Sequence, residues 1–177
     1  MDFYELITKR QSERQYDVRP VESDKMMQCI QAARLAPSAC NAQPWKFIVV
    51  DEPELKKQLA SATAGMGMNK IAFDAPAIVA IVLEKPNVMS KIGSVLKGKE
   101  YTLIDIGIAA AHFCLQATDL GLGTCIIGWF DEKKVRKLLQ VPNKKRIPLL
   151  LTIGYTTNEI RTKQRKELNV MYHANKY

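Results

Sequence analysis

Two short segments of the chain carry the side chains best suited to binding a ligand. In the first, residues 10–14 (Arg-Gln-Ser-Glu-Arg), Arg10 and Arg14 stand four residues apart with the Ser12 hydroxyl between them. Guanidinium groups and a hydroxyl are the donors that phosphate oxygens accept from. Charged residues are also common at solvated helix ends. A phosphate site and a plain basic helix end are therefore both open for this segment.

The second segment is a polar loop, residues 36–45, that two prolines stiffen. It offers Ser38, Asn41 and Gln43 as hydrogen-bonding side chains. A preorganised loop of this kind suits a planar heterocycle with carbonyls and ring nitrogens. As an isolated turn it would be unremarkable.

Other chemical signals in the chain are weak. Residues 93–99 match the GxxxxGK pattern, but Glu100 follows where a phosphate-binding loop needs a hydroxyl, and no strand precedes the pattern. Three glycines within residues 121–128 lie between a predicted helix and a predicted strand, which favours a helix end and a tight turn over a dinucleotide fingerprint. His112 lies in an apolar helix and is expected in the core. The cysteines form no CxxC pair, so no metal site is expected.

Composition narrows the classes of protein. The 177 residues are 47% apolar and 25% charged, as in one soluble globular domain. No apolar stretch is long enough to span a membrane, and the start, MDFYELITKR, resembles no export signal, so a cytoplasmic location is expected. The net charge is +8, with basic groups within residues 9–19, 133–146 and 161–166. Because aromatics are only 7%, small phosphorylated ligands are favoured over nucleic acid.

The elements that must position these segments alternate between helix and strand, which indicates an α/β layer sandwich. The apolar run 77–83 is predicted as a central strand buried on both faces, and residues 85–100 as a mobile loop. The tail after Tyr155 has no core pattern, so it must either fray or lie on a partner. Helices are predicted from Asp2 through residue 10, from 23 or 24 until Pro37, from an Asp51 cap to 62, over 102–120 and from Asp131 to 140; the other strands are predicted over 46–50, 124–128 and 148–155.

Four motifs together resemble the FMN-dependent nitroreductase family over almost the whole chain. Residues 10–14 resemble its Arg-x-Ser-x-Arg opening and residues 37–45 its P-S-x-x-N-x-Q-P-W loop. Residues 121–128 resemble its G-L-G-x-x-x-x-G segment, and residues 163–165 its C-terminal K-x-R. The resemblance implies an FMN site formed by Arg10, Gln11, Ser12, Arg14, Pro37, Ser38, Ala39, Asn41, Gln43, Asn69, Ile127, Gly128, Lys163 and Arg165.

The resemblance also implies a fold and an activity. The expected fold is α+β, a three-layer α/β/α sandwich with a central mixed sheet, in an intertwined homodimer with FMN at the subunit interface. Residues 1–177 would form one domain whose tail, residues 156–177, wraps the partner. The expected activity is hydride transfer from NAD(P)H through the flavin to a nitroaromatic or quinone-like acceptor, with no catalytic side chain and no metal.

Two alternatives stay open at the level of sequence. One is a flavin- or anion-binding module without activity, and the other is a different reaction of the same flavin superfamily, such as dehalogenation or flavin cleavage. The chain also departs from the family pattern. Gln11 stands where a basic residue or histidine is common, Ile127 where one branch has a carboxylate, and Trp129 where a small residue is usual.

Overall fold

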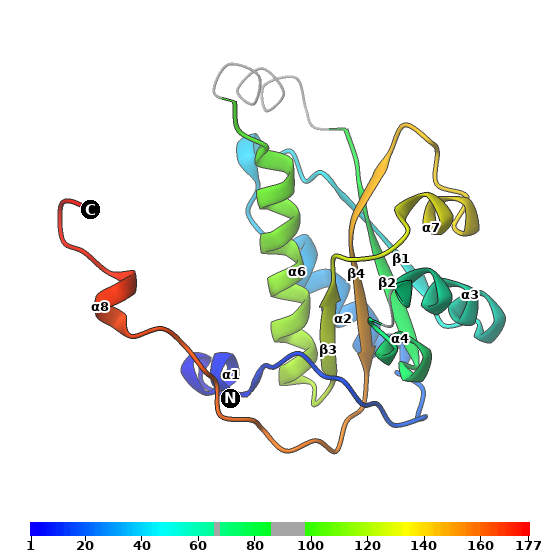
Figure 1. Cartoon of the computed structure of the whole chain (residues 1–177), viewed down its shortest axis with the longest axis horizontal. Helices are drawn as coiled ribbons and strands as arrows, with labels where there is room; N and C mark the ends of the chain where they lie inside the picture. Colours follow the sequence, from blue (N-terminus) through cyan, green and yellow to red (C-terminus); the bar gives the residue numbers. More distant parts are fainter. Residues whose placement is uncertain (66–67, 86–97) are drawn as a thin grey trace.

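A computed structural model describes residues 1–65, 68–85 and 98–177 of the chain (Figure 1). Most of the predicted mobile loop and most of the GxxxxGK pattern lie outside the described residues. In chain order the elements are α1 (Phe3–Lys9), α2 (Ser23–Arg34), η1 (Ala39–Asn41), β1 (Trp45–Val50), α3 (Pro53–Thr63), α4 (Ile71–Asp74), β2 (Ala77–Leu83), α6 (Tyr101–Asp119), β3 (Gly123–Ile127), α7 (Glu132–Leu138), β4 (Arg146–Gly154) and α8 (Leu168–Met171).

The four strands form one sheet in the order β1-β2-β4-β3. All three pairings are antiparallel, with Val79 of β2 opposite Val49 of β1 and Leu151 of β4. The expectation of a mixed sheet is therefore wrong for these strands: in the described part of the chain, the parallel pairing is one isolated bridge from Ser12, which lies in no strand, to Thr124. The predicted central position of β2 is confirmed.

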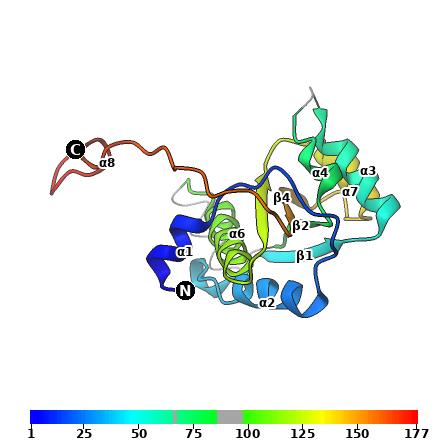
Figure 2. The ribbon, with the colours of Figure 1, turned by 90° about the horizontal axis from the view of Figure 1, so that it is seen from below.

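Helices cover both faces of the sheet (Figure 2). Because side chains alternate along a strand, Val79 faces the core beneath α2 and α6, while Ile78 faces the core beneath α3, α4 and α7. Phe113 of α6 and Leu59 of α3 are fully buried on the two sides. Two buried faces explain the continuous apolar sequence of β2, and the expected α+β three-layer fold is confirmed.

Helix boundaries follow local hydrogen bonding. Asp2 caps α1 by accepting from the Glu5 amide at 2.8 Å, as predicted. The predicted Asp51 cap of α3 is wrong, because the Glu52 carboxylate accepts from the amides of residues 54 and 55 instead. Gly121 follows α6 with φ +76°, a conformation that glycine adopts without strain.

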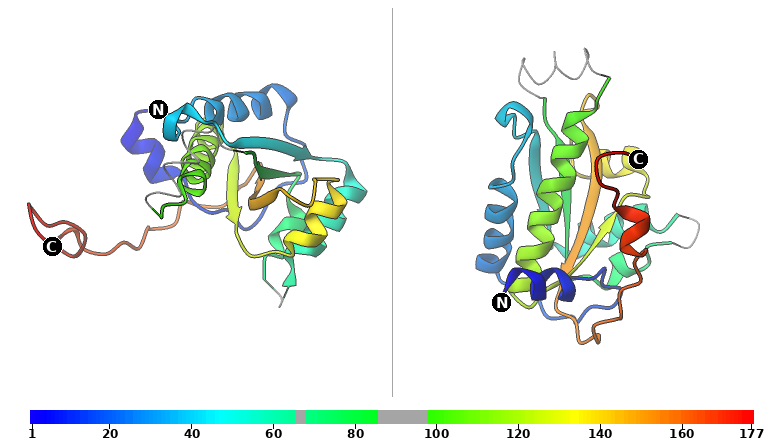
Figure 3. Two further views of the ribbon diagram at one scale, coloured as in Figure 1. Left: turned by 90° about the horizontal axis from the view of Figure 1, so that it is seen from above. Right: turned by 90° about the vertical axis from the view of Figure 1, so that its left-hand side faces the viewer.

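The two ends of the chain meet on one side of the molecule and then diverge. The segment after α1 and the segment after β4 run side by side at the C-terminal end of α6, and the last residues, with α8, extend away from the body (Figures 1 and 3). The tail keeps its apolar side chains exposed: Leu168 is 74% and Met171 66% accessible. The expected contact of the tail with a partner stays a prediction, while the first part of the tail is hydrogen-bonded to Gln11 and Ser12 of its own chain. No helix in the described ranges is long and apolar enough to cross a membrane.

Candidate functional site

A basic cleft lies where residues 10–14 meet residues 161–165. Its volume is about 260 Å³, and five cationic side chains contribute to its wall. Among the residues that the structure describes, no acidic side chain lines it. The lining residues are Arg10, Gln11, Ser12, Arg14, Arg161, Thr162, Lys163 and Arg165. The structure therefore brings together the two segments that the sequence assigned to a phosphate.

The five cations of this cleft concentrate positive charge in one place. Within the described ranges, none of the five cations takes part in an ion pair. Partial burial, together with the neighbouring Arg10, Arg165 and Arg161, lowers the pKa of Lys163. Mutual repulsion of this kind is relieved when an anion binds among the charges. The charges that line the cleft therefore favour a negatively charged ligand over a positively charged one.

The N-terminal half of the cleft is fixed to the edge strand β3. The Glu13 amide donates to the Thr124 carbonyl at 2.9 Å, and Ser12 forms the bridge to the same residue. Glu13 is buried directly against Gly123, where a Cβ would lie 2.4 Å from the Glu13 Cγ. A side chain at Gly123 would therefore push residues 10–14 off the sheet.

A second group of predicted site residues lies at the other end of β3. Asn69 has φ +55°, and its side-chain amide donates to the Trp129 carbonyl at 2.8 Å, next to the exposed Gly128. Ile127 is 2% exposed and packs in the core beneath α3, so only its backbone is available to a ligand. From Thr124 to Gly128 is about 13 Å of strand. The cleft and this second group therefore border one edge of the sheet.

The loop of residues 37–43 is held in an unusual backbone conformation. Cys40, Asn41 and Gln43 all have φ between +44° and +52°. Two contacts hold the loop: the Ser38 hydroxyl accepts from the Gln43 amide at 2.9 Å, and the Asp105 Oδ1 of α6 accepts from the backbone amide of residue 39 at 3.1 Å. Left-handed residues other than glycine cost energy and are common at ligand sites.

This loop does not reach the basic cleft of its own chain. The loop contacts Asp105 near the start of α6, whereas the cleft lies beyond the end of α6 at Asp119 (Figures 1 and 3). The helix between these two residues is about 21 Å long. Pro37, Ser38, Ala39, Asn41 and Gln43 are therefore separated from Arg10, Gln11, Ser12, Arg14, Lys163 and Arg165 within one chain.

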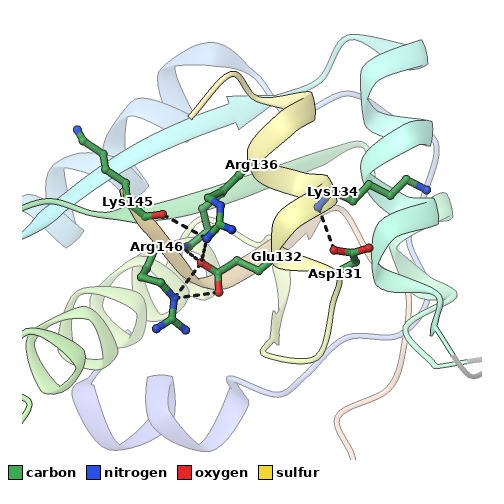
Figure 4. A network of polar contacts seen from close by, with 7 residues as sticks. Asp131, Glu132, Lys134, Arg136, Lys145 and Arg146 are labelled. Atoms are coloured by element: carbon green, nitrogen blue, oxygen red, sulfur yellow. Dashed lines mark hydrogen bonds and ion pairs between the residues drawn. The ribbon is translucent and has the colours of Figure 1, made fainter. Parts of the chain in front are cut away.

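Another basic region, residues 133–146, differs in its electrostatics. Glu132 accepts from Arg136 Nη1, from Arg146 Nε and from the Ile147 amide, each at 3.0 Å (Figure 4). Lys145 forms an ion pair with Glu84 at 2.5 Å. The contacts of Glu132 hold α7 against β4, and the pair of Lys145 with Glu84 joins the start of β4 to the end of β2, so Arg136, Lys145 and Arg146 have a structural role.

Comparison with known proteins agrees with this architecture. The sequence model of the nitroreductase family matches residues 7–67 and 61–155. An oxygen-insensitive NADPH nitroreductase of Helicobacter acinonychis is 29% identical, covering 93% of this chain and 92% of its own length. An iodotyrosine deiodinase of Thermotoga neapolitana is 24% identical over 97% of both chains. The structure of an FMN-dependent nitroreductase from Clostridium difficile superposes with a TM-score of 0.81, at 29% identity over 97% of this chain and 98% of the other.

These matches cover most of the chain and all of the sheet. The chain belongs to the nitroreductase family, and the resemblance drawn from its motifs is confirmed. The motifs did not identify Arg161 and Thr162, which line the cleft together with Lys163 and Arg165. In the sequence, Arg161 is one member of the basic group within residues 161–166, and its spacing does not indicate which other cations line the same cleft.

Proposed function

We propose that the protein is an FMN-dependent oxidoreductase that takes a hydride from NAD(P)H and passes electrons to a nitroaromatic or quinone-like acceptor. The observation that carries the proposal is the cleft formed by both ends of the chain, in which the described lining residues include five cations and no acid. A terminal phosphate matches this set of donors in charge and in hydrogen-bonding character. Family membership adds the class of cofactor.

The residues divide into a phosphate-binding set and a ring-binding set. Arg10, Ser12, Arg14, Lys163 and Arg165 would hold the phosphate, and the group at Asn69 and Gly128 would contact the flavin further along β3. Bound FMN would supply the electron carrier between the two substrates. The protein's own residues bind and orient it, and no side chain is needed as a nucleophile.

We further propose a homodimer in which each flavin site draws on both chains. The loop of residues 37–43 lies about 21 Å of helix away from the cleft of its own chain. A partner's copy of the loop would complete the site. The exposed apolar side chains of the tail, residues 156–177, support this arrangement, because Leu168, Val170, Met171 and Tyr172 have no core to pack in within one chain. Their burial on a partner would offset the cost of ordering the tail.

The proposal is tested on the purified full-length protein. The expected result is a flavin absorbance spectrum that bleaches rapidly under anaerobic addition of NADH or NADPH and returns when a nitroaromatic or quinone is added. Mass analysis of the released cofactor should give FMN, since several charges around one terminal phosphate leave little place for an adenylate. A colourless protein that binds no added FMN, or one that releases FAD, would contradict it.

The same experiment separates the alternatives. A yellow protein that NAD(P)H does not reduce would be a flavin-binding module without this activity. Dehalogenation is the second candidate reaction, supported by the similarity to an iodotyrosine deiodinase over 97% of the chain. Halide release from a halogenated phenol, measured with the reduced protein, would favour dehalogenation over nitro reduction if it proceeded faster than reduction of a nitroaromatic.

A further inference from the structure

Arg161 occupies a special place in the cleft. It belongs to the C-terminal half of the cleft, residues 161–165, and both its backbone and its side chain are hydrogen-bonded to the N-terminal half, residues 10–14. The backbone amide and the Nε atom of Arg161 both donate to the Gln11 Oε1, at 3.0 and 3.2 Å. The Nη2 atom of Arg161 donates to the Ser12 carbonyl. Two nitrogen atoms of the side chain and the backbone amide are thus all hydrogen-bonded, which gives the Arg161 guanidinium a defined position in an exposed segment.

The side-chain amide of Gln11 acts both as a hydrogen-bond acceptor and as a hydrogen-bond donor in this network. While its amide oxygen accepts from Arg161, its amide nitrogen donates to the Glu13 carboxylate at 2.9 Å and to the Glu159 carbonyl at 3.1 Å. The second Glu13 oxygen accepts from the Asn158 side chain at 3.0 Å. Glu13 is itself 6% exposed. The hydrogen-bonding capacity of the Gln11 amide is thus used within the protein.

The charge balance explains why this network matters. Arg161 adds to the positive field that lowers the pKa of Lys163, so it lies close to the other cations. Bringing a further cation to four others is unfavourable without fixed contacts or a bound anion. The hydrogen bonds from Arg161 to Gln11 and Ser12 are such fixed contacts. A bound phosphate would be the anion.

We propose that Arg161 is a further phosphate-binding residue and that Gln11 is the positioning residue that holds it in the cleft. This inference rests on the proposed FMN function. It also assigns Gln11 a role different from direct cofactor binding, since its amide already bonds to Arg161, Glu13 and the residue 159 carbonyl. The Gln11 side chain joins the tail to residues 10–14, and the cationic side chains of the cleft would bind the phosphate.

The test compares FMN with riboflavin, which has the same ring but no phosphate. Full-length protein freed of flavin is titrated with each, and the ratio of the two dissociation constants measures the contribution of the phosphate. Arg161→Gln should lower the preference for FMN about tenfold, while the affinity for riboflavin stays the same. Gln11→Met, which keeps the length but removes the hydrogen bonds, should lower the preference about threefold. Arg161→Lys should restore part of the loss, because the charge remains without the guanidinium fork.

Lys166→Gln is the matched control, since it removes a nearby charge of the tail that does not line the cleft. Its preference for FMN should equal that of the wild type. The inference is overturned if Arg161→Gln keeps the full preference, or if FMN and riboflavin lose affinity by the same factor, which would mark a general structural effect. A wild-type protein that binds both flavins equally would give a different result: it would overturn the proposed phosphate cleft, and the role of Arg161 with it.

Discussion

Two regions of the molecule carry dense positive charge, and they differ in what faces that charge. Around α7, Arg136 and Arg146 share the carboxylate of Glu132, and Lys145 pairs with Glu84. In the cleft at the C-terminal end of α6, no acid forms an ion pair with any of the five cations among the described residues. The two regions are similar in sequence composition.

The difference leads us to expect that pairing, rather than the number of charges, decides which of the two regions binds an anion. A paired cation is already neutralised locally, so an anion gains little by approaching it. An unpaired group of cations repels itself and gains from the same anion. Substitutions in the cleft should therefore affect binding, and substitutions around α7 should affect stability.

The largest effect is expected from shortening the tail. Ending the chain after Asn158 removes Arg161, Lys163 and Arg165, so the affinity for FMN should fall by more than about a thousandfold, at roughly tenfold or more for each charge-assisted contact. The same truncation should weaken the dimer. Equilibrium titration and sedimentation measure the two effects.

A chain that ends after Lys166 is the control for this truncation. It keeps every cation of the cleft but loses the apolar residues 168–172. Sedimentation should show a weaker dimer, because the side chains proposed to pack on the partner are gone. If this shorter chain stays as firmly dimeric as the wild type, the tail serves the phosphate alone. A full-length protein that sediments as a monomer with bound FMN would refute the shared site.

Single substitutions in the cleft come next. Arg14→Ala and Arg165→Ala should each lower the affinity for FMN about tenfold to a hundredfold, because each removes a charge-assisted hydrogen bond to the phosphate. The free energy of unfolding of the flavin-free protein should change little, since neither side chain forms an ion pair with any residue that the structure describes. Flavin titration and urea denaturation check the two halves of this expectation. Unchanged affinity in both variants would show that the phosphate lies elsewhere.

The converse is expected around α7. Glu132→Ala removes the acceptor shared by Arg136, Arg146 and the Ile147 amide, and the Arg136 side chain is only 19% exposed. The free energy of unfolding should fall by about 1.5 to 3 kcal/mol, the usual loss for hydrogen bonds to a charged group. Urea denaturation at fixed protein concentration measures this fall, and the affinity for FMN should remain that of the wild type. A large loss of FMN affinity in Glu132→Ala would remove the distinction between the two regions.

The sequence predicted the main elements because their signals are local. The apolar run of β2, the Asp2 cap and the long apolar helix α6 each have a pattern that short-range physics explains. The cap of α3 was placed one residue too early because Asp51 and Glu52 are both acids. The helices η1, α4 and α8 are too short to produce a periodic pattern.

The candidate site was predictable only in part, because it depends on contacts between residues that are far apart in the sequence. The motifs grouped residues 10–14 with residues 163–165, but the contribution of Arg161 depends on contacts across 150 positions of sequence with Gln11. The separation of the loop from the cleft likewise depends on which ends of α6 they occupy. The pairing of Glu132 with Arg136 follows an i,i+4 spacing that a sequence can show, whereas the pairing with Arg146 does not.

The smallest effect concerns the point where the tail leaves the body. The Tyr155 hydroxyl donates to the Glu22 carboxylate at 2.6 Å, and Arg19 bonds to the same carboxylate. The hydrogen bond from Tyr155, with backbone and Arg19 contributions, lowers the pKa of Glu22 to about 2. A carboxylate with a lowered pKa stabilises the folded state above its unfolded pKa of about 4.5 and loses this contribution as the pH falls toward 2.

Tyr155→Phe should therefore be less stable than the wild type at neutral pH. The Arg19 guanidinium would still pack over the ring, which it meets at 4.0 Å from the centroid. The difference in unfolding free energy between the two proteins should be constant above about pH 4.5 and shrink between pH 4.5 and 2, because protonated Glu22 no longer gains from the phenol as a charged acceptor. Urea denaturation of both proteins across this range measures the difference. If it stays constant with pH, the hydrogen bond does not govern the charge of Glu22, and the pairing there would resemble the solvent-screened ion pairs of an ordinary surface.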